Sequence, residues 1–197
     1  FFFSCVRDPP GSPLVAWSRA AYGYKNQARA GGKAGHPFAG SHARGPGPEP
    51  VLAGFPSRKR MLDELVDRVR GWIDEGVDPM AIGVAARTNR QVEAAKNALD
   101  AAGLTTCLLP QRDLPNQLGV RLGTMHRMKG LEYERVAISD ADDDSVPAAW
   151  AMTDRHDDEV QHVSDLELEK CLLYVAATRA RDGLYITWSG TPSRFLG

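Results

Sequence analysis

Short apolar runs alternate with segments of helical periodicity over residues 57–188, and this alternation restricts the folds that the chain can adopt. Residues 81–86 (A-I-G-V-A-A) form an apolar run between polar neighbours, which is typical of a strand buried on both faces of a sheet. Further strands are predicted at residues 104–109, 119–124, 135–139 and 184–188. Because strands separated by helices pair in parallel, the pattern predicts an α/β fold: a mostly parallel sheet with helices on both faces.

Two helices are predicted with well-defined ends. Apolar residues recur on one helical face over residues 57–76, where a glycine ends the pattern. The next helix follows Thr88, which can form a capping box with Gln91, and it ends before Gly103. The first helix precedes the predicted strand at 81–86, and the second separates that strand from the one at 104–109.

A third helix is expected to begin at a capping box of Ser164 and Glu167 and to end before the last strand. Between the strands at 119–124 and 135–139 there is room only for a short helical turn, which we expect over residues 128–131. The connection between these two strands is therefore mostly loop.

Residues 1–50 differ from the rest of the chain. They hold eight glycines and seven prolines, a density that disfavours regular elements, and six Lys or Arg against two acidic residues. One interpretation is a nucleic-acid-binding arm with interleaved aromatic residues, and the other is a poorly ordered or truncated leader. Residues 51–197 are then expected to form one folded domain.

Charge and cysteine content exclude several classes of protein. The formal net charge of −1 gives no overall attraction to polyanions, so any contact with nucleic acid must use a local patch. Cys5, Cys107 and Cys171 are odd in number and lack C-x-x-C spacing, which argues against a disulfide framework and a zinc site. A reducing, cytoplasmic location is expected, and no apolar run reaches membrane-spanning length.

Polar groups gather after the apolar run at 119–124. Thr124, His126, Lys129 and Glu132 lie around Gly130, where the backbone could approach a ligand closely. In α/β proteins such groups at element ends commonly converge on one crevice, which makes this segment a candidate binding site. The alternative is a surface loop with solvated charges, in which His126 is an ordinary hydrogen-bonded histidine.

Arg179 and Arg181 lie at the end of the third predicted helix. An arginine at a domain rim can clamp a phosphoryl group of a neighbouring domain, and the alternative is a pair of cations that complement the helix C-terminus. No G-x-x-x-x-G-K-[ST] sequence occurs, so any nucleotide must be shared with another domain. Four aspartates after the strand at 135–139 are expected to be solvated, and no metal site is predicted: Asp140, Asp142, Asp143 and Asp144.

Two ordered segments resemble a known family. Residues 124–133 (T-M-H-R-M-K-G-L-E-Y) and 172–182 (L-L-Y-V-A-A-T-R-A-R-D) resemble helicase motifs V and VI of the UvrD/Rep family of DNA helicases, and residues 82–89 resemble the strand and turn that precede them. The resemblance covers roughly residues 51–197. It implies a RecA-like fold: the second motor domain of a P-loop NTPase-like enzyme, without the P-loop, that closes over ATP bound to the first.

Carried over by position, the resemblance implies an ATP-binding set. Arg179 is similar to the arginine finger that meets the γ-phosphate, and it is the one catalytic residue implied. Glu132 is similar to a glutamate that approaches the sugar of the nucleotide, and Gly130 would let the backbone come near it.

The resemblance also implies a DNA-binding set. Thr124 and His126 match positions that touch the backbone of single-stranded DNA and couple it to the nucleotide cleft, and Arg87 and Asn89 resemble further contacts with that strand. Such contacts grip phosphates or sugars without reading bases, as a translocating motor requires.

The activity that the resemblance implies is an ATP-dependent DNA helicase, which couples ATP hydrolysis to translocation on single-stranded DNA and to duplex unwinding. Its cofactor would be ATP with Mg²⁺, and its partners single-stranded DNA and an N-terminal RecA-like ATPase domain. The Walker A loop, the acidic Mg²⁺ motif and an N-Y-R segment are missing, so the chain resembles a truncated product that is inactive alone. The alternative is a non-enzymatic module that binds single-stranded DNA or completes another ATPase subunit.

Overall fold

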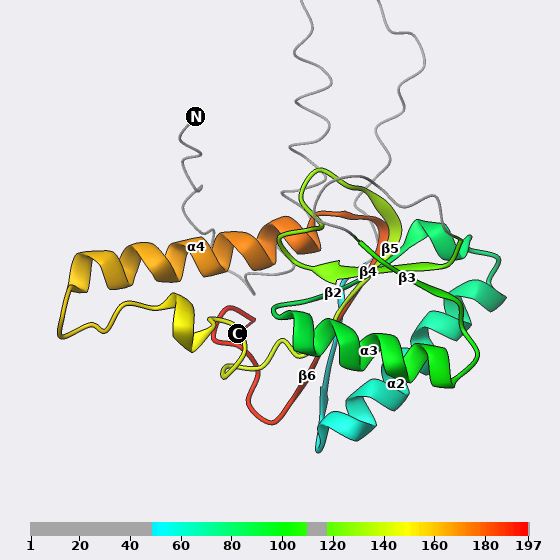
Figure 1. The fold of residues 1–197 in the computed structure, drawn as a ribbon, viewed down its shortest axis with the longest axis horizontal. Helices are drawn as coiled ribbons and strands as arrows, with labels where there is room; N and C mark the ends of the chain where they lie inside the picture. The colour runs from blue at the N-terminus through cyan, green and yellow to red at the C-terminus, as the bar shows by residue number, and fades with distance from the viewer. Residues whose placement is uncertain (1–48, 110–117, 197) are drawn as a thin grey trace, which may run out of the picture.

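The computed structural model describes residues 49–109 and 118–196, and within them six strands form one sheet whose neighbouring strands are all parallel. Across the sheet the strand order is β1-β6-β5-β2-β4-β3. The strands are β1 Val51–Phe55, β2 Ile82–Ala86, β3 Thr106–Leu108, β4 Val120–Thr124, β5 Tyr133–Ile138 and β6 Ala180–Ser189. The predicted α/β class is confirmed, and Figure 1 shows the sheet between its helices.

Helices cover both faces of the sheet. α2 (Arg58–Asp74) and α3 (Asn89–Ala101) pack on one face, and α4 (Glu159–Ala177) packs on the other. Successive residues of a strand point to opposite faces, so Val84 of β2 contacts the α2 and α3 side while Ala85 contacts the α4 side. β2 is buried along its whole length, which explains its unbroken apolar sequence.

Side-chain caps begin α2 and α3 where the sequence indicates. Ser57 Oγ accepts a hydrogen bond from the backbone N–H of Arg60 (3.3 Å). Thr88 Oγ1 accepts from the backbone N–H of Gln91 (3.3 Å), and Gln91 Oε1 accepts from the backbone N–H of Thr88 (2.9 Å). Both helices and the capping box of α3 are therefore confirmed.

The predicted start of α4 was wrong. The helix begins at Glu159, with the carboxylate of Asp158 as its cap, so Ser164 and Glu167 lie inside it. The first half of α4 projects beyond the sheet (Figure 1) and leaves apolar side chains exposed. Because this half has no core to face, its sequence lacks the apolar periodicity that marks a helix start.

The structure also differs from the prediction at β1 and at residues 125–132. β1 was not predicted, because it is a half-exposed edge strand with a glycine and gives a weak pattern. Residues 125–130 form turns and residues 131–132 are irregular, so the helical turn expected at 128–131 is absent. Residues 1–48 lie outside the described residues, so the leader and the domain boundary near residue 50 stay predictions. No helix in the described ranges has the length and apolar character to cross a bilayer.

Candidate nucleotide and DNA interfaces

The candidate site residues divide between the two edges of the parallel sheet. Four of them lie at the carboxyl ends of β2 and β4: Arg87, Asn89, Thr124 and His126. The other three precede the amino ends of β5 and β6, at the opposite edge: Gly130, Glu132 and Arg179. The expectation of a single crevice was therefore wrong, because the length of the strands separates the two sets.

At the amino edge, Arg179 follows the C-terminus of α4 and is half-buried. Its Nε donates to the backbone oxygen of Val175 (2.9 Å), and its other two nitrogens donate to Leu131 O (3.4 Å) and Thr178 Oγ1 (3.2 Å). The alternative, in which Arg179 complements the C-terminus of α4 as a cation, requires such a contact with a terminal carbonyl of the helix. However, none of these acceptors is a carboxylate, so within the described residues no acidic group neutralises the guanidinium.

Arg181 differs from Arg179 in this respect. Its guanidinium donates to the carboxylates of Glu134 (2.7 Å) and Asp182 (2.8 Å), and these contacts raise the pKa of Arg181. Two acidic partners neutralise this exposed arginine. Of the two arginines in the motif, Arg179 is thus the one whose charge remains available to an anionic ligand.

A short crossover, residues 125–132, connects the two edges. Met125 and Met128 are fully buried and hold it against the sheet on the α4 side. Gly130 adopts φ +85°, and a Cβ atom at this position would meet nothing within 4 Å, so the backbone there is open to the surroundings. Glu132, at the end of the crossover, is exposed. The crossover therefore begins among the DNA-binding candidates and ends among the nucleotide-binding candidates.

At the carboxyl edge, Arg87 is buried, with only 4% of its side chain exposed. Its Nε and Nη2 donate to the two carboxylate oxygens of Glu169 on α4 (2.8 and 2.6 Å). The backbone N–H of Ala148 donates to the same carboxylate (3.1 Å). Burial alone would raise the pKa of Glu169, but the hydrogen bonds from Arg87 and Ala148 lower it below the ordinary value.

Two residues near this ion pair complete the cluster. The guanidinium carbon of Arg87 lies 4.5 Å from the ring centroid of Trp150, a cation–π contact. His126 is exposed, and its pKa is lowered by partial burial and by the charge of Arg87, against the opposing effect of Glu169. A neutral imidazole can both donate and accept hydrogen bonds. Thr124 is buried at the end of β4, and Asn89 is exposed at the first turn of α3.

Sequence reasoning missed Glu169 and Trp150. Glu169 lies one turn before the buried Leu173 on α4, so its inward position is readable once the helix is known. For Trp150 there was no local signal, because its contact with Arg87 joins distant parts of the chain. Both residues belong to the cluster that holds the candidate DNA-binding edge in place.

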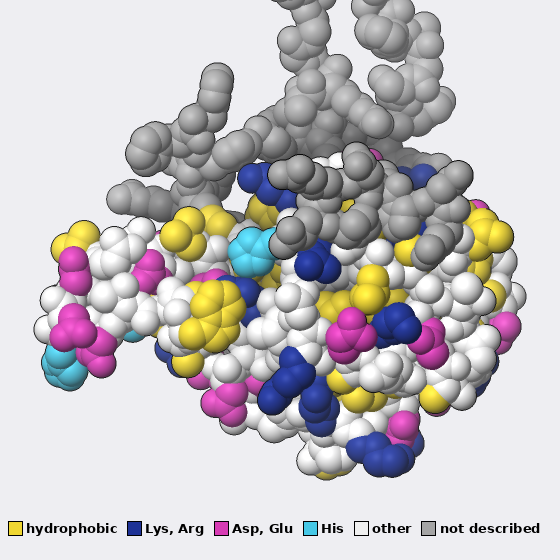
Figure 2. All heavy atoms as spheres, in the orientation of Figure 1, with side chains coloured by type: hydrophobic (Ala, Val, Ile, Leu, Met, Phe, Trp, Pro, Cys, Tyr) yellow, Lys and Arg dark blue, Asp and Glu magenta, His cyan; other side chains and the backbone are white. Residues whose placement is uncertain are grey.

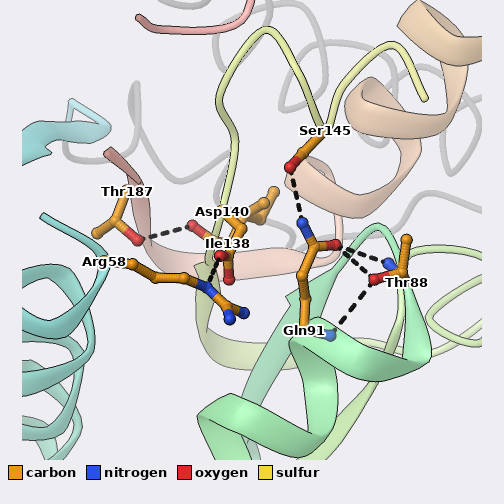
Figure 3. A network of polar contacts seen from close by, with 7 residues as sticks. All are labelled: Arg58, Thr88, Gln91, Ile138, Asp140, Ser145 and Thr187. Atoms are coloured by element: carbon orange, nitrogen blue, oxygen red, sulfur yellow. Dashed lines mark hydrogen bonds and ion pairs between the residues drawn. The ribbon is translucent and has the colours of Figure 1, made fainter. Parts of the chain in front are cut away.

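Figure 3 shows the neighbouring part of the carboxyl edge. Asp140, at φ +54° after β5, is buried and accepts from Arg58 Nε at the start of α2 (2.5 Å), so the expectation that it is solvated was wrong. Gln91 Nε2 donates to Ser145 Oγ (2.7 Å), which ties α3 to the loop after β5. In the described part of the chain, no group of three or more His, Cys, Asp or Glu side chains could hold a metal ion.

The two motifs and the parallel α/β fold are those of the C-terminal domain of a helicase. A family model described as "UvrD-like helicase C-terminal domain" matches residues 84–191, and the chain belongs to this family. The match includes both ends of the crossover, the buried ion pair and Arg179. The predicted family is thereby confirmed.

Similar proteins carry helicase names. The chain is 40% identical over 78 residues to the Bacillus subtilis protein named "Putative ATP-dependent DNA helicase YjcD", covering 39% of this chain and 10% of the relative. It is 38% identical over 89 residues to "ATP-dependent DNA helicase PcrA" of Staphylococcus aureus, covering 40% of this chain and 11% of that protein. The chain thus spans about a tenth of the length of these relatives.

A solved structure shares the fold. It is described as the C-terminal domain of a possible DNA helicase from Lactobacillus plantarum, with a TM-score of 0.58 and 24% sequence identity over 77% of this chain and 80% of that one. At this level of identity the likeness supports the RecA-like α/β arrangement of the sheet and helices.

Proposed function

We propose that this chain is the second motor domain of an ATP-dependent DNA helicase, which completes the ATP site of an N-terminal RecA-like ATPase domain and grips single-stranded DNA. The observation that supports this proposal is the division of the candidate residues between two edges joined by the crossover 125–132. A motor needs separate contacts with the nucleotide and with the DNA strand, and a direct connection between these contacts.

At the amino edge, Arg179 is the proposed arginine finger. Its unneutralised guanidinium stabilises the charge that develops on the γ-phosphate, an effect worth about 10³ to 10⁵ in rate. Gly130 and Glu132 approach the sugar of the same nucleotide. By the resemblance, Mg²⁺ would be held by the phosphates and by the other domain, where it would neutralise phosphate charge.

At the carboxyl edge, Asn89, Thr124 and His126 are proposed to contact the sugar–phosphate backbone of the single strand. Arg87 stays a predicted contact, and its buried pair with Glu169 means that it would act mainly by holding this edge in shape. Contacts of this kind do not read bases, which suits translocation along any sequence.

The proposal includes inactivity of the isolated chain, because the sequence contains no phosphate-binding loop. Purified chain alone is expected to show no DNA-stimulated ATPase, and addition of an N-terminal motor domain of the same family is expected to restore it. Turnover by the chain alone, in a preparation free of contaminating helicase, would contradict this part of the proposal.

The finger assignment is tested in the same mixture. Arg179→Ala should lower kcat by about 10³- to 10⁵-fold. Arg181→Ala is the matched control: its guanidinium is already paired with carboxylates, so its kcat should change by about twofold at most. Equal rates for Arg179→Ala and the unmodified chain would contradict the finger assignment. No restored ATPase with the unmodified chain, with DNA binding retained, would favour the alternative of a non-enzymatic DNA-binding or partner module.

A further inference from the structure

Trp150 is unusually exposed for a tryptophan. It lies in the short 3₁₀ helix η2 (Ala149–Ala151), in the loop between β5 and α4, and 73% of its surface is accessible. Large aromatic side chains are normally well buried, since each can remove a large apolar area from water. Figure 2 shows hydrophobic side chains at the surface of the projecting part of the molecule, where this loop and the start of α4 lie.

One face of the Trp150 ring rests on a rigid support. The Arg87 guanidinium lies 4.5 Å from the ring centroid and is itself fixed by two hydrogen bonds to Glu169. The same carboxylate accepts from the backbone N–H of Ala148, so the loop that carries the ring is anchored to the ion pair as well. The ring is therefore held in place, although most of its surface is in contact with solvent.

The position of the ring matches the proposed DNA-binding edge. Arg87 directly follows β2, and His126 lies two residues beyond the end of β4. The charges of Arg87 and Glu169 both influence the pKa of His126, so the three side chains lie near one another. A single strand gripped by its phosphates along this edge would pass beside the open side of the ring. Bases of such a strand are unpaired and present their flat faces to aromatic side chains.

We propose that Trp150 is a stacking platform for a nucleobase of the single strand. The proposal rests on the proposed function. It adds a contact with a base to an edge that is otherwise expected to contact only the sugar–phosphate backbone of the DNA. Every base has a π-face, so a contact of this kind strengthens binding without selecting sequence. Arg87, on the opposite face, would keep the ring in position for stacking.

The test compares two fluorescently labelled strands of equal length: oligothymidylate and an abasic strand with the same phosphates. The full chain is expected to bind oligothymidylate about 5- to 100-fold more tightly by fluorescence anisotropy. Trp150→Ala should bind both strands with the affinity that the full chain has for the abasic strand, and Trp150→Phe should keep part of the preference. Val160→Ala is the matched control, because this side chain is also exposed, at 82%, on the projecting part.

Three outcomes would overturn the proposal. If Trp150→Ala keeps the full preference for oligothymidylate, the ring does not stack on bases, although the backbone contacts would stand. If Trp150→Ala lowers the affinity for both strands equally while its circular dichroism is unchanged, the ring only supports the ion pair. If the unmodified chain binds neither strand, the proposed function fails and the stacking proposal fails with it.

Discussion

Arg87 and Glu169 keep a full charge pair inside the protein, with side-chain exposures of 4% and 7%. Taking two charges out of water is costly, and the pair is tolerated because both carboxylate oxygens and the guanidinium are hydrogen-bonded. Removing one partner leaves the other charge buried without compensation. This makes the stability of the domain depend on the protonation of one carboxylate.

We predict that Glu169→Gln lowers the free energy of unfolding by about 3 kcal/mol at pH 7, because the variant leaves the charge of Arg87 buried without an ionised partner. The pKa of Glu169 is lowered in the folded state. Its contribution is therefore complete above the unfolded pKa, near 4.5, and is lost as the pH falls through the folded value. The difference between the unmodified chain and the variant should shrink towards zero below that pH in urea titrations.

Glu134→Gln serves as the control for this experiment. Glu134 pairs with Arg181 at the surface, where 37% and 50% of the two side chains are exposed. Such a pair is worth less than about 1 kcal/mol, so this variant should be close to the unmodified chain at every pH. A pH-independent penalty for Glu169→Gln would show that the loss comes from packing and not from the ionised carboxylate.

The sequence could place the motif residues but not their partners. Arg87 was recognised within a strand-and-turn pattern, whereas its pairing with Glu169, 82 residues away, depends on α4 crossing the sheet. The division of Gly130 and Thr124 between opposite edges follows from the parallel direction of β4 and β5, which the pattern of strands and helices already indicated. Contacts of long sequence separation are the part of a site that a single sequence leaves open.

Among the helices and strands, those that are buried along their length were predicted more accurately than those with exposed parts. α2 and α3 lie against the sheet along their length, so the apolar faces of both and the cap of α3 were visible in the sequence. α4 and β1 have exposed parts, and there the predicted start was wrong or the element was missed. An element that projects from the core loses the pattern by which it is recognised.

This difference gives a prediction at the scale of helices. Thr88→Ala removes the cap of α3, which packs in the core, and should lower the global free energy of unfolding by about 1 kcal/mol. Asp158→Ala removes the cap of α4, whose first half projects from the sheet, so the same local loss should fray the helix with little global effect. Urea unfolding measures the first effect, and amide hydrogen exchange at residues 159–163 measures the second.

Ser164→Ala is the internal control, because this residue lies within α4 and its replacement should leave both measurements nearly unchanged. If Asp158→Ala lowers the global stability as much as Thr88→Ala does, the first half of α4 must unfold cooperatively with the rest of the domain. That result would contradict the view of a projecting helix end.

For the whole molecule, the crossover 125–132 is the shortest covalent path between the two proposed binding edges. Met125 and Met128 fix it to the core, and the Leu131 carbonyl accepts from Arg179 Nη1 (3.4 Å), so its far end touches the proposed finger. A movement of either edge would therefore displace residues at the other. In a complex with the N-terminal motor domain, binding of an ATP analogue and of single-stranded DNA should be coupled, each raising the affinity for the other by the same factor.

Gly130→Ala should reduce this coupling factor. Its φ of +85° is unfavourable for any residue with a Cβ, at a cost of about 1 kcal/mol, while the space beside it is open, so the strain acts on the crossover backbone and not through a clash. The coupling factor is measured as the ratio of DNA affinities with and without the analogue. It should fall by at most about fivefold, because only the part of this energy that differs between the states with and without the analogue changes the coupling. Gly103→Ala carries a similar backbone penalty, at φ +79° with open space, but lies between α3 and β3 and outside the crossover. An equal coupling factor in the two variants would mean that the edges communicate by a route other than the crossover.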